Sequence, residues 1–141
     1  MKPMFRFEKI EAWQRAREFN AVIYNVLRGF PKEELFALTA QLRRASISIS
    51  SNIAEGSGRN SDADFAHFLE IAYGSLMESV SQLFLAFDQE YLSESQLNAL
   101  LEEADALAGM IVGLSKSLGR KPRITPPPQA RASLDPSRAP R

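Results

Sequence analysis

Few side chains in this sequence are suited to catalysis, and none lies at catalytic spacing. The single histidine, His67, sits in the run Asp64-Phe65-Ala66-His67-Phe68, which supplies no partner at metal-ligand spacing. The chain has no cysteine, which excludes a thiolate nucleophile, a disulfide framework and a cysteine-based zinc site. We therefore interpret His67 as a surface or interface residue and expect no enzyme activity, no metal and no cofactor.

Serines and carboxylates cluster in two places. Ser46, Ser48, Ser50 and Ser51 have no neighbouring base that would activate a hydroxyl, and their small size favours close helix packing. The acidic run at 102–105 lies opposite a stripe of leucines, so a solvated helix face explains it better than a pair of acid/base carboxylates.

The segment Gly56-Ser57-Gly58-Arg59 has the glycines of a phosphate-binding loop. A Walker loop follows a strand and ends in Gly-Lys-Ser/Thr, whereas here a helical pattern precedes and Arg59-Asn60-Ser61 follows. We interpret the segment as a glycine C-cap at Gly56 and a tight turn, which leaves Arg59 to contact a carboxylate, a neighbouring subunit or a phosphate.

Arginines are the side chains most suggestive of a ligand. Arg43 and Arg44 are adjacent, Arg59 follows shortly after, and no Lys or Arg occurs between Arg59 and Lys116. In an assembly of several copies such a patch repeats, which favours multivalent contact with nucleic-acid phosphates. The alternative is structural: Arg43 and Arg44 form salt bridges to Glu55 or to acids of the first helix.

The positions of proline indicate the elements that carry these residues. No proline occurs from Lys32 to Lys121, which predicts long helices joined by short turns. Apolar residues at helical spacing predict four helices, at about 9–28, 33–55, 61–88 and 93–118. A two-residue alternation within 45–50 resembles a strand, but the helical stripe continues on both sides of it. Two S-x-x-D/Q capping boxes are expected, Ser61 with Asp64 and Ser93 with Gln96.

Short connections favour an all-α, antiparallel up-down-up-down four-helix bundle. The second and third helices carry apolar residues beyond the stripe that a monomer needs. They are Phe36, Ala40, Ile47, Ala54, Tyr73, Met77 and Phe84. This surplus predicts self-association through the second and third helices into a closed cyclic oligomer.

Charge and proline divide the chain into two parts. Residues 1–118 form the expected bundle domain, with a net charge of −5. Residues 119–141 hold six of the eight prolines and six basic side chains against one acidic one, a net charge of +5. We expect this tail to be disordered, either binding RNA or an acidic partner loosely through Arg120, Lys121 and Arg123 or serving only solubility. The charged start and the lack of a long apolar stretch favour a cytoplasmic protein without membrane contact.

The sequence around the second helix resembles a known family. The residues that carry the resemblance are ELFALTAQLRRASISISSNIAEG at 34–56, Gly58-Arg59-x-Ser61 and DFAHFLEIAYGSLME at 64–78. Trp13-Gln14-x-Ala16, Phe30-Pro31-x-Glu33 and Tyr91-Leu92 add shorter matches. Over about residues 5–118 the chain resembles the bacterial four-helix-bundle family named for proteins encoded in intervening sequences of 23S rRNA genes.

The resemblance implies a homopentamer without catalytic activity. The chain is more distantly similar to the accessory proteins of diversity-generating retroelements, which bind nucleic acid together with a reverse transcriptase and are usually more basic than this body. Two functions follow as hypotheses. In one, Arg43, Arg44, Arg59 and the tail contact RNA or DNA in an accessory protein, with a reverse transcriptase as a possible partner. In the other, the protein is a protein-interaction scaffold that binds no nucleic acid.

Overall fold

The computed structural model describes residues 1–119, which contain four α-helices, two short 3₁₀ helices and no strand. The elements are η1 (Arg6–Lys9), α1 (Glu11–Leu27), η2 (Lys32–Glu34), α2 (Leu38–Ser57), α3 (Asp62–Asp88) and α4 (Glu94–Ser117). The predicted all-α fold with four helices is confirmed. None of the helices in this part of the chain has the length and hydropathy needed to cross a bilayer.

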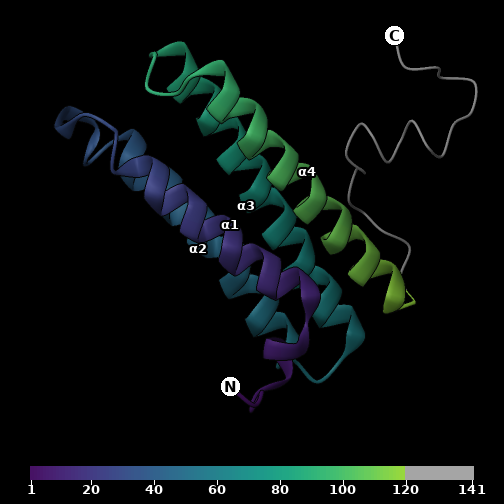
Figure 1. Cartoon of the computed structure of the whole chain (residues 1–141). Coiled ribbons are helices and arrows are strands. Elements are labelled where there is room, and N and C mark those ends of the chain that lie inside the picture. Colours follow the sequence, from purple (N-terminus) through teal and green to yellow (C-terminus); the bar gives the residue numbers. More distant parts are fainter. Residues whose placement is uncertain (120–141) are drawn as a thin grey trace, which may run out of the picture.

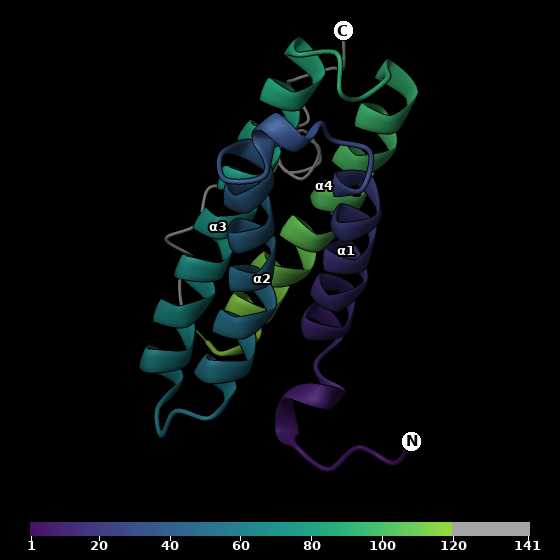
Figure 2. The same cartoon turned by 90° about the vertical axis from the view of Figure 1, so that its left-hand side faces the viewer.

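Each helix lies beside the next one in the chain, and α1 also contacts α4, which closes the bundle (Figures 1 and 2). The contact between α2 and α3 is the most extensive, and that between α1 and α4 is the smallest of the four. The chain turns back sharply after α2 and again after α3. The end of α4 therefore lies at the same end of the molecule as the start of α3 (Figure 1).

The core follows from the helical spacing of the apolar residues. Phe19 and Ile23 from α1, Ile49 from α2, Leu76 from α3 and Leu107 from α4 have no exposed surface. They belong to one continuous cluster that all four helices share. Burial of these side chains is the main favourable term that holds the helices together.

Local signals fix several helix ends. Ser93 and Gln96 form the complete capping box, because each side chain accepts a hydrogen bond from the other's backbone N–H. At α3 only half of the expected box forms: the Ser61 hydroxyl accepts from the Asp64 N–H at 3.1 Å. Gly119, with φ of +71°, follows the end of α4 in the left-handed conformation that favours glycine.

The start of the second helix was predicted too early. Residues 32–34 form the separate turn η2, and Ala37, with φ −120° and ψ −107°, interrupts the helical backbone before Leu38. The Glu34 carboxylate then accepts the Leu38 N–H at 3.1 Å, so it satisfies one of the amides left free at the new helix start.

The interpretation of Gly56 as a C-cap was wrong. Gly56 lies inside α2, which continues to Ser57. A Cβ at residue 56 would stand 2.7 Å from the Phe68 Cβ and 2.9 Å from the Phe65 Cδ1. Glycine is therefore required here by the close approach of α2 and α3 rather than by the end of the helix.

Small residues also bring α2 and α3 together further along. The Ser48 and Ser75 hydroxyls lie 2.8 Å apart across the two helices. Larger side chains from the surplus apolar set remain on the surface, with exposed fractions of 92% for Phe36 and 46% for Phe84. Tyr73 is buried, while Ile47 and Met77 are exposed.

Candidate nucleic-acid interface

The three body arginines predicted to contact phosphate do not form one cluster. Arg43 and Arg44 are consecutive on α2, so their side chains leave the helix about 100° apart. Arg59 follows the end of α2, about 22 Å along the helix axis from Arg44. Each guanidinium accordingly has different neighbours.

Arg43 turns towards α1. Its guanidinium carbon lies 5.6 Å from the centre of the Tyr24 ring, a distance at which the ring face attracts a cation. The Arg43 Nε is buried and has no hydrogen-bond partner within the described residues. A half-buried arginine held in this way has a packing role and only part of its guanidinium available to a ligand.

Arg44 turns towards α3. It pairs with the Glu78 carboxylate and donates a second hydrogen bond to the Gln41 Oε1 at 2.9 Å. The expected partners of Arg43 and Arg44, Glu55 or acids of the first helix, are therefore wrong. Arg44 keeps 58% of its side chain exposed, so several of its five N–H donors still face solvent.

Arg59 packs at the turn between α2 and α3. It pairs with the Glu55 Oε1 at 3.0 Å, and its guanidinium carbon lies 4.7 Å from the centre of the Phe68 ring. Its side chain is 46% exposed. The Phe68 ring and the Glu55 carboxylate together fix the direction of the Arg59 guanidinium, which remains accessible to solvent.

Arg6 was missed by the sequence interpretation and lies at the same end of the bundle. It donates to the Ser57 carbonyl at 3.0 Å and stands 5.4 Å from the centre of the Phe65 ring. The available signal was the run Phe5-Arg6-Phe7, a cation between two aromatic residues just before the first helix. Arg6 and Arg59 therefore flank the close approach of α2 and α3.

Formal charge is divided unevenly along the chain. Residues 1–59 carry ten basic and six acidic side chains, whereas residues 60–115 carry ten acidic and no basic ones. Two ion pairs join the halves, Arg44 with Glu78 and Arg15 with Glu103 at 3.9 Å. Positive charge in the described region thus comes mainly from the part of the chain up to the turn after α2, and Lys116 near the end of α4 is the one basic residue beyond it. The predicted tail residues Arg120, Lys121 and Arg123 lie outside the described residues.

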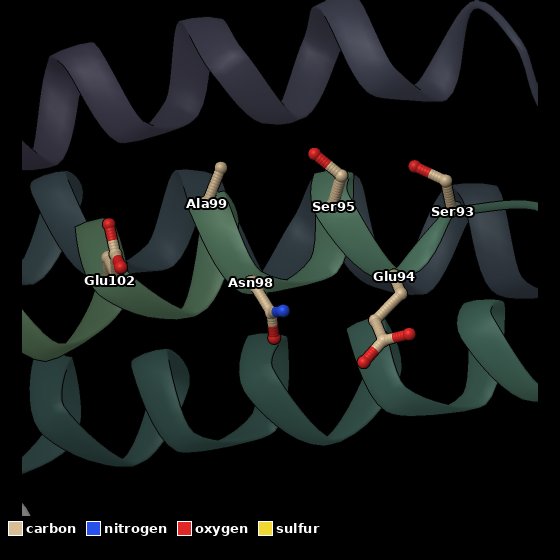
Figure 3. Close-up of a pocket in the computed structure, with 6 residues that line it drawn as sticks. All are labelled: Ser93, Glu94, Ser95, Asn98, Ala99 and Glu102. Atoms are coloured by element: carbon tan, nitrogen blue, oxygen red, sulfur yellow. The ribbon is translucent and has the colours of Figure 1, made fainter.

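A surface hollow of about 730 Å³ lies over the first turns of α4. It is lined by Ser93, Glu94, Ser95, Asn98, Ala99 and Glu102. Figure 3 shows Glu94 and Asn98 pointing to the α3 side of the helix, whereas Ser95 and Ala99 point to the α1 side. These groups diverge, so they do not form a nucleophile with its base. Among residues 1–119 no three metal-ligating side chains gather at one point.

Local contacts shift the pKa values of Glu8 and Tyr91. The Phe5 and Met4 amides donate to the Glu8 Oε2 at 2.6 and 2.7 Å, and these bonds lower the pKa of that carboxyl below 4.5. The stabilisation of the N-terminal turn is therefore present above pH 4.5 and is lost as pH falls through the lowered pKa. Desolvation, together with donation to the Glu34 Oε1 at 3.1 Å, raises the pKa of Tyr91 above 10.0.

We expect the raised pKa of Tyr91 to produce a loss of stability at alkaline pH. The folded protein binds this proton more tightly than the unfolded chain, so the stabilisation is present below pH 10.0 and is lost as pH rises through the raised pKa. Urea unfolding of the natural chain and of Tyr91→Phe, from about pH 8 to about pH 11, measures the effect. Equal alkaline slopes for the two proteins would show that Tyr91 does not contribute.

Residues 8–113 match the family described as 23S rRNA-intervening sequence protein. The chain belongs to this family. A crystal structure of a protein of unknown function from the S23 ribosomal protein family of Bacteroides thetaiotaomicron VPI-5482 has the same fold, with a TM-score of 0.69. The two sequences are 24% identical, and the match covers 74% of this chain and 98% of that one. No curated protein matches the chain.

The segment that matches the 23S rRNA-intervening sequence protein family includes the contacts between α2 and α3. Gly56 and the two phenylalanines it contacts lie within the matched segment, as do the Ser48–Ser75 contact and the Arg44–Glu78 pair. The conspicuous motif therefore contains the residues that hold α2 against α3.

Proposed function

We propose that this member of the 23S rRNA-intervening sequence protein family is a non-enzymatic nucleic-acid-binding accessory protein. The observation that carries the proposal is the pairing and the exposure of the Arg44 and Arg59 side chains. Each is held in direction by a carboxylate, yet each keeps about half of its side chain exposed. An arginine contacts one carboxylate with only some of its five N–H donors, so the others remain for a phosphate. The family name, which refers to rRNA, makes RNA the first ligand to test.

We propose that five copies of an up-down-up-down bundle form a closed ring, as the family resemblance implies. Exposed apolar side chains on α2, on α3 and just before α2 support this, notably Phe36, Ile47, Met77 and Phe84. A ring repeats Arg44 and Arg59 once in every copy, so several weak phosphate contacts combine into strong multivalent binding. Light scattering should give a mass several times 15.7 kDa, and a mass near 15.7 kDa at micromolar concentration would overturn the ring.

Binding of RNA and DNA oligonucleotides over a salt series tests the proposed function. We expect affinity to fall steeply as salt rises, because each neutralised phosphate releases counterions. The double variant Arg44→Gln/Arg59→Gln should bind more weakly and lower the slope of log K against log salt by about 1 for each lost contact.

Arg28→Gln is the matched control. Arg28 is an exposed arginine directly after α1, which ends at the opposite end of the bundle from the turn between α2 and α3 (Figure 1). It donates a hydrogen bond to the Asn25 Oδ1 at 3.4 Å, and no ion pair involves it among residues 1–119. It should retain the affinity and slope of the natural chain. An equal loss in the control variant, or no binding at low salt, would refute the assigned arginines.

The intramolecular pairing of Arg44 with Glu78 and of Arg59 with Glu55 favours a second candidate, a protein-interaction scaffold. On that view the arginines stabilise the bundle, and the oligonucleotide titration gives no binding. A reverse transcriptase is the partner proposed under the first function. Co-purification of the two proteins, with and without nuclease treatment, tests that partner directly.

A further inference from the structure

One face of α4 carries no apolar side chain. Its residues are Gly113, Gly109, Asp105, Glu102, Asn98 and Glu94, which follow each other at intervals of three or four and so lie in one row along the helix. All are exposed except Asp105, which is half-exposed. The row runs from the end of α4, where residue 119 leaves the bundle, to the surface hollow at its start (Figure 3). We call this row the α4 track.

The two glycines of the track are not required by the bundle itself. A Cβ at Gly109 or at Gly113 would meet no atom of residues 1–119 within 4 Å. Glycine inside a helix costs about 0.5–1 kcal/mol relative to alanine, so the bundle gains nothing from either residue. What they provide is a stretch of bare helix backbone on which another chain segment could lie closely.

The carboxylates of the track lack basic partners within the described residues. Glu94, Glu102 and Asp105 have no Lys or Arg within 4.0 Å among residues 1–119. They belong to the segment 60–115, which carries ten acidic and no basic side chains. Lys116 is the one cation on this side of the helix, at the end where the track begins.

We propose that residues 120–141 of the same chain dock along the α4 track. Charge is complementary, because those residues carry six basic side chains and one acidic one. Length also suffices: an extended segment of 22 residues spans about 68 Å at 3.1 Å per residue, and the 24 residues of α4 span about 36 Å. The proposal does not depend on nucleic-acid binding.

The position of Arg131 gives the docking a register. A segment extended back along α4 from residue 119 at about 3.1 Å per residue brings Arg131 level with Glu94 in the hollow, whereas Arg123 lies level with the two glycines and short of Asp105. A tether of this kind holds the segment at millimolar effective concentration, so even a few weak charge pairs give substantial occupancy.

Spin labels on introduced cysteines test the proposal cleanly, because the chain has no cysteine of its own. Labels at Ser95→Cys and Ala130→Cys should give a short-distance population that disappears in high salt. The control pair, Ser51→Cys on α2 with Ala130→Cys, should give only a broad, long distribution. No nucleic acid is present, so failure here leaves the proposed function untouched.

Charge variants identify the surface. Glu102→Gln/Asp105→Asn should abolish the short distance, whereas Glu11→Gln/Glu33→Gln, which removes the same charge from surface positions outside the track, should retain it. Gly109→Gln/Gly113→Gln should also abolish it, because the side chains cover the bare backbone. Equal distributions in the two label pairs, or retention in both acid-to-amide variants, would overturn the docking. Loss of the short distance on dilution with unlabelled protein would overturn docking within one chain.

Discussion

Replacing Phe19 by alanine should lower the free energy of unfolding by about 3–5 kcal/mol, which is a large part of the stability of a domain of this size. Phe19 projects from the middle of α1 and has no exposed surface in a core that all four helices share. The substitution removes the whole ring and leaves a cavity that helices held at several other points cannot close. Urea unfolding followed by circular dichroism measures the change.

Phe36→Ala is the matched control, since the same ring is 92% exposed just before α2. In a monomer this change should alter stability by no more than about 0.5 kcal/mol. If copies associate through Phe36, the control should instead lower the mass seen by light scattering. A loss for Phe19→Ala no larger than that for Phe36→Ala in a monomeric sample would contradict the described core.

Much of the fold could be predicted because its signals are local. Each helix is specified by an apolar stripe within its own residues. The start of α4 is specified by the Ser93–Gln96 box, and its end by Gly119. The start of α2 could not be predicted in this way. The apolar and acidic pattern of residues 33–37 suits a helix, and the interruption at Ala37 depends on how the chain passes from α1 to α2.

The candidate site was harder to predict because its contacts are distant in sequence. The Arg44–Glu78 pair joins residues 34 positions apart, and the Arg6–Ser57 bond joins residues 51 positions apart. Charge alone identified Arg44 and Arg59 as candidate contacts. The Arg59–Glu55 pair is local, with a spacing of four residues, but only the packing of α2 on α3 brings Arg44 to Glu78 and Arg59 to the Phe68 ring.

Replacing Gly56 by alanine should destabilise the protein by about 1–3 kcal/mol, although alanine is the better helix former. The new methyl group would stand 2.7 Å from the Phe68 Cβ and 2.9 Å from the Phe65 ring. A Cβ atom cannot rotate away, so relief requires α3 to move from α2 at its first turns. That movement would also disturb the Arg59–Phe68 contact and the hydrogen bond from Arg6 to Ser57.

The sign of the stability change in Gly56→Ala distinguishes a steric clash with α3 from an effect of helix propensity. Gly113→Ala makes the same change inside α4, where a Cβ meets nothing within 4 Å among residues 1–119, and it should stabilise the chain by about 0.5–1 kcal/mol. Urea midpoints should therefore move in opposite directions for two identical substitutions. If Gly56→Ala were as stable as the natural chain, α2 and α3 would have room to separate at this point. The close contact assigned to the family motif would then be wrong.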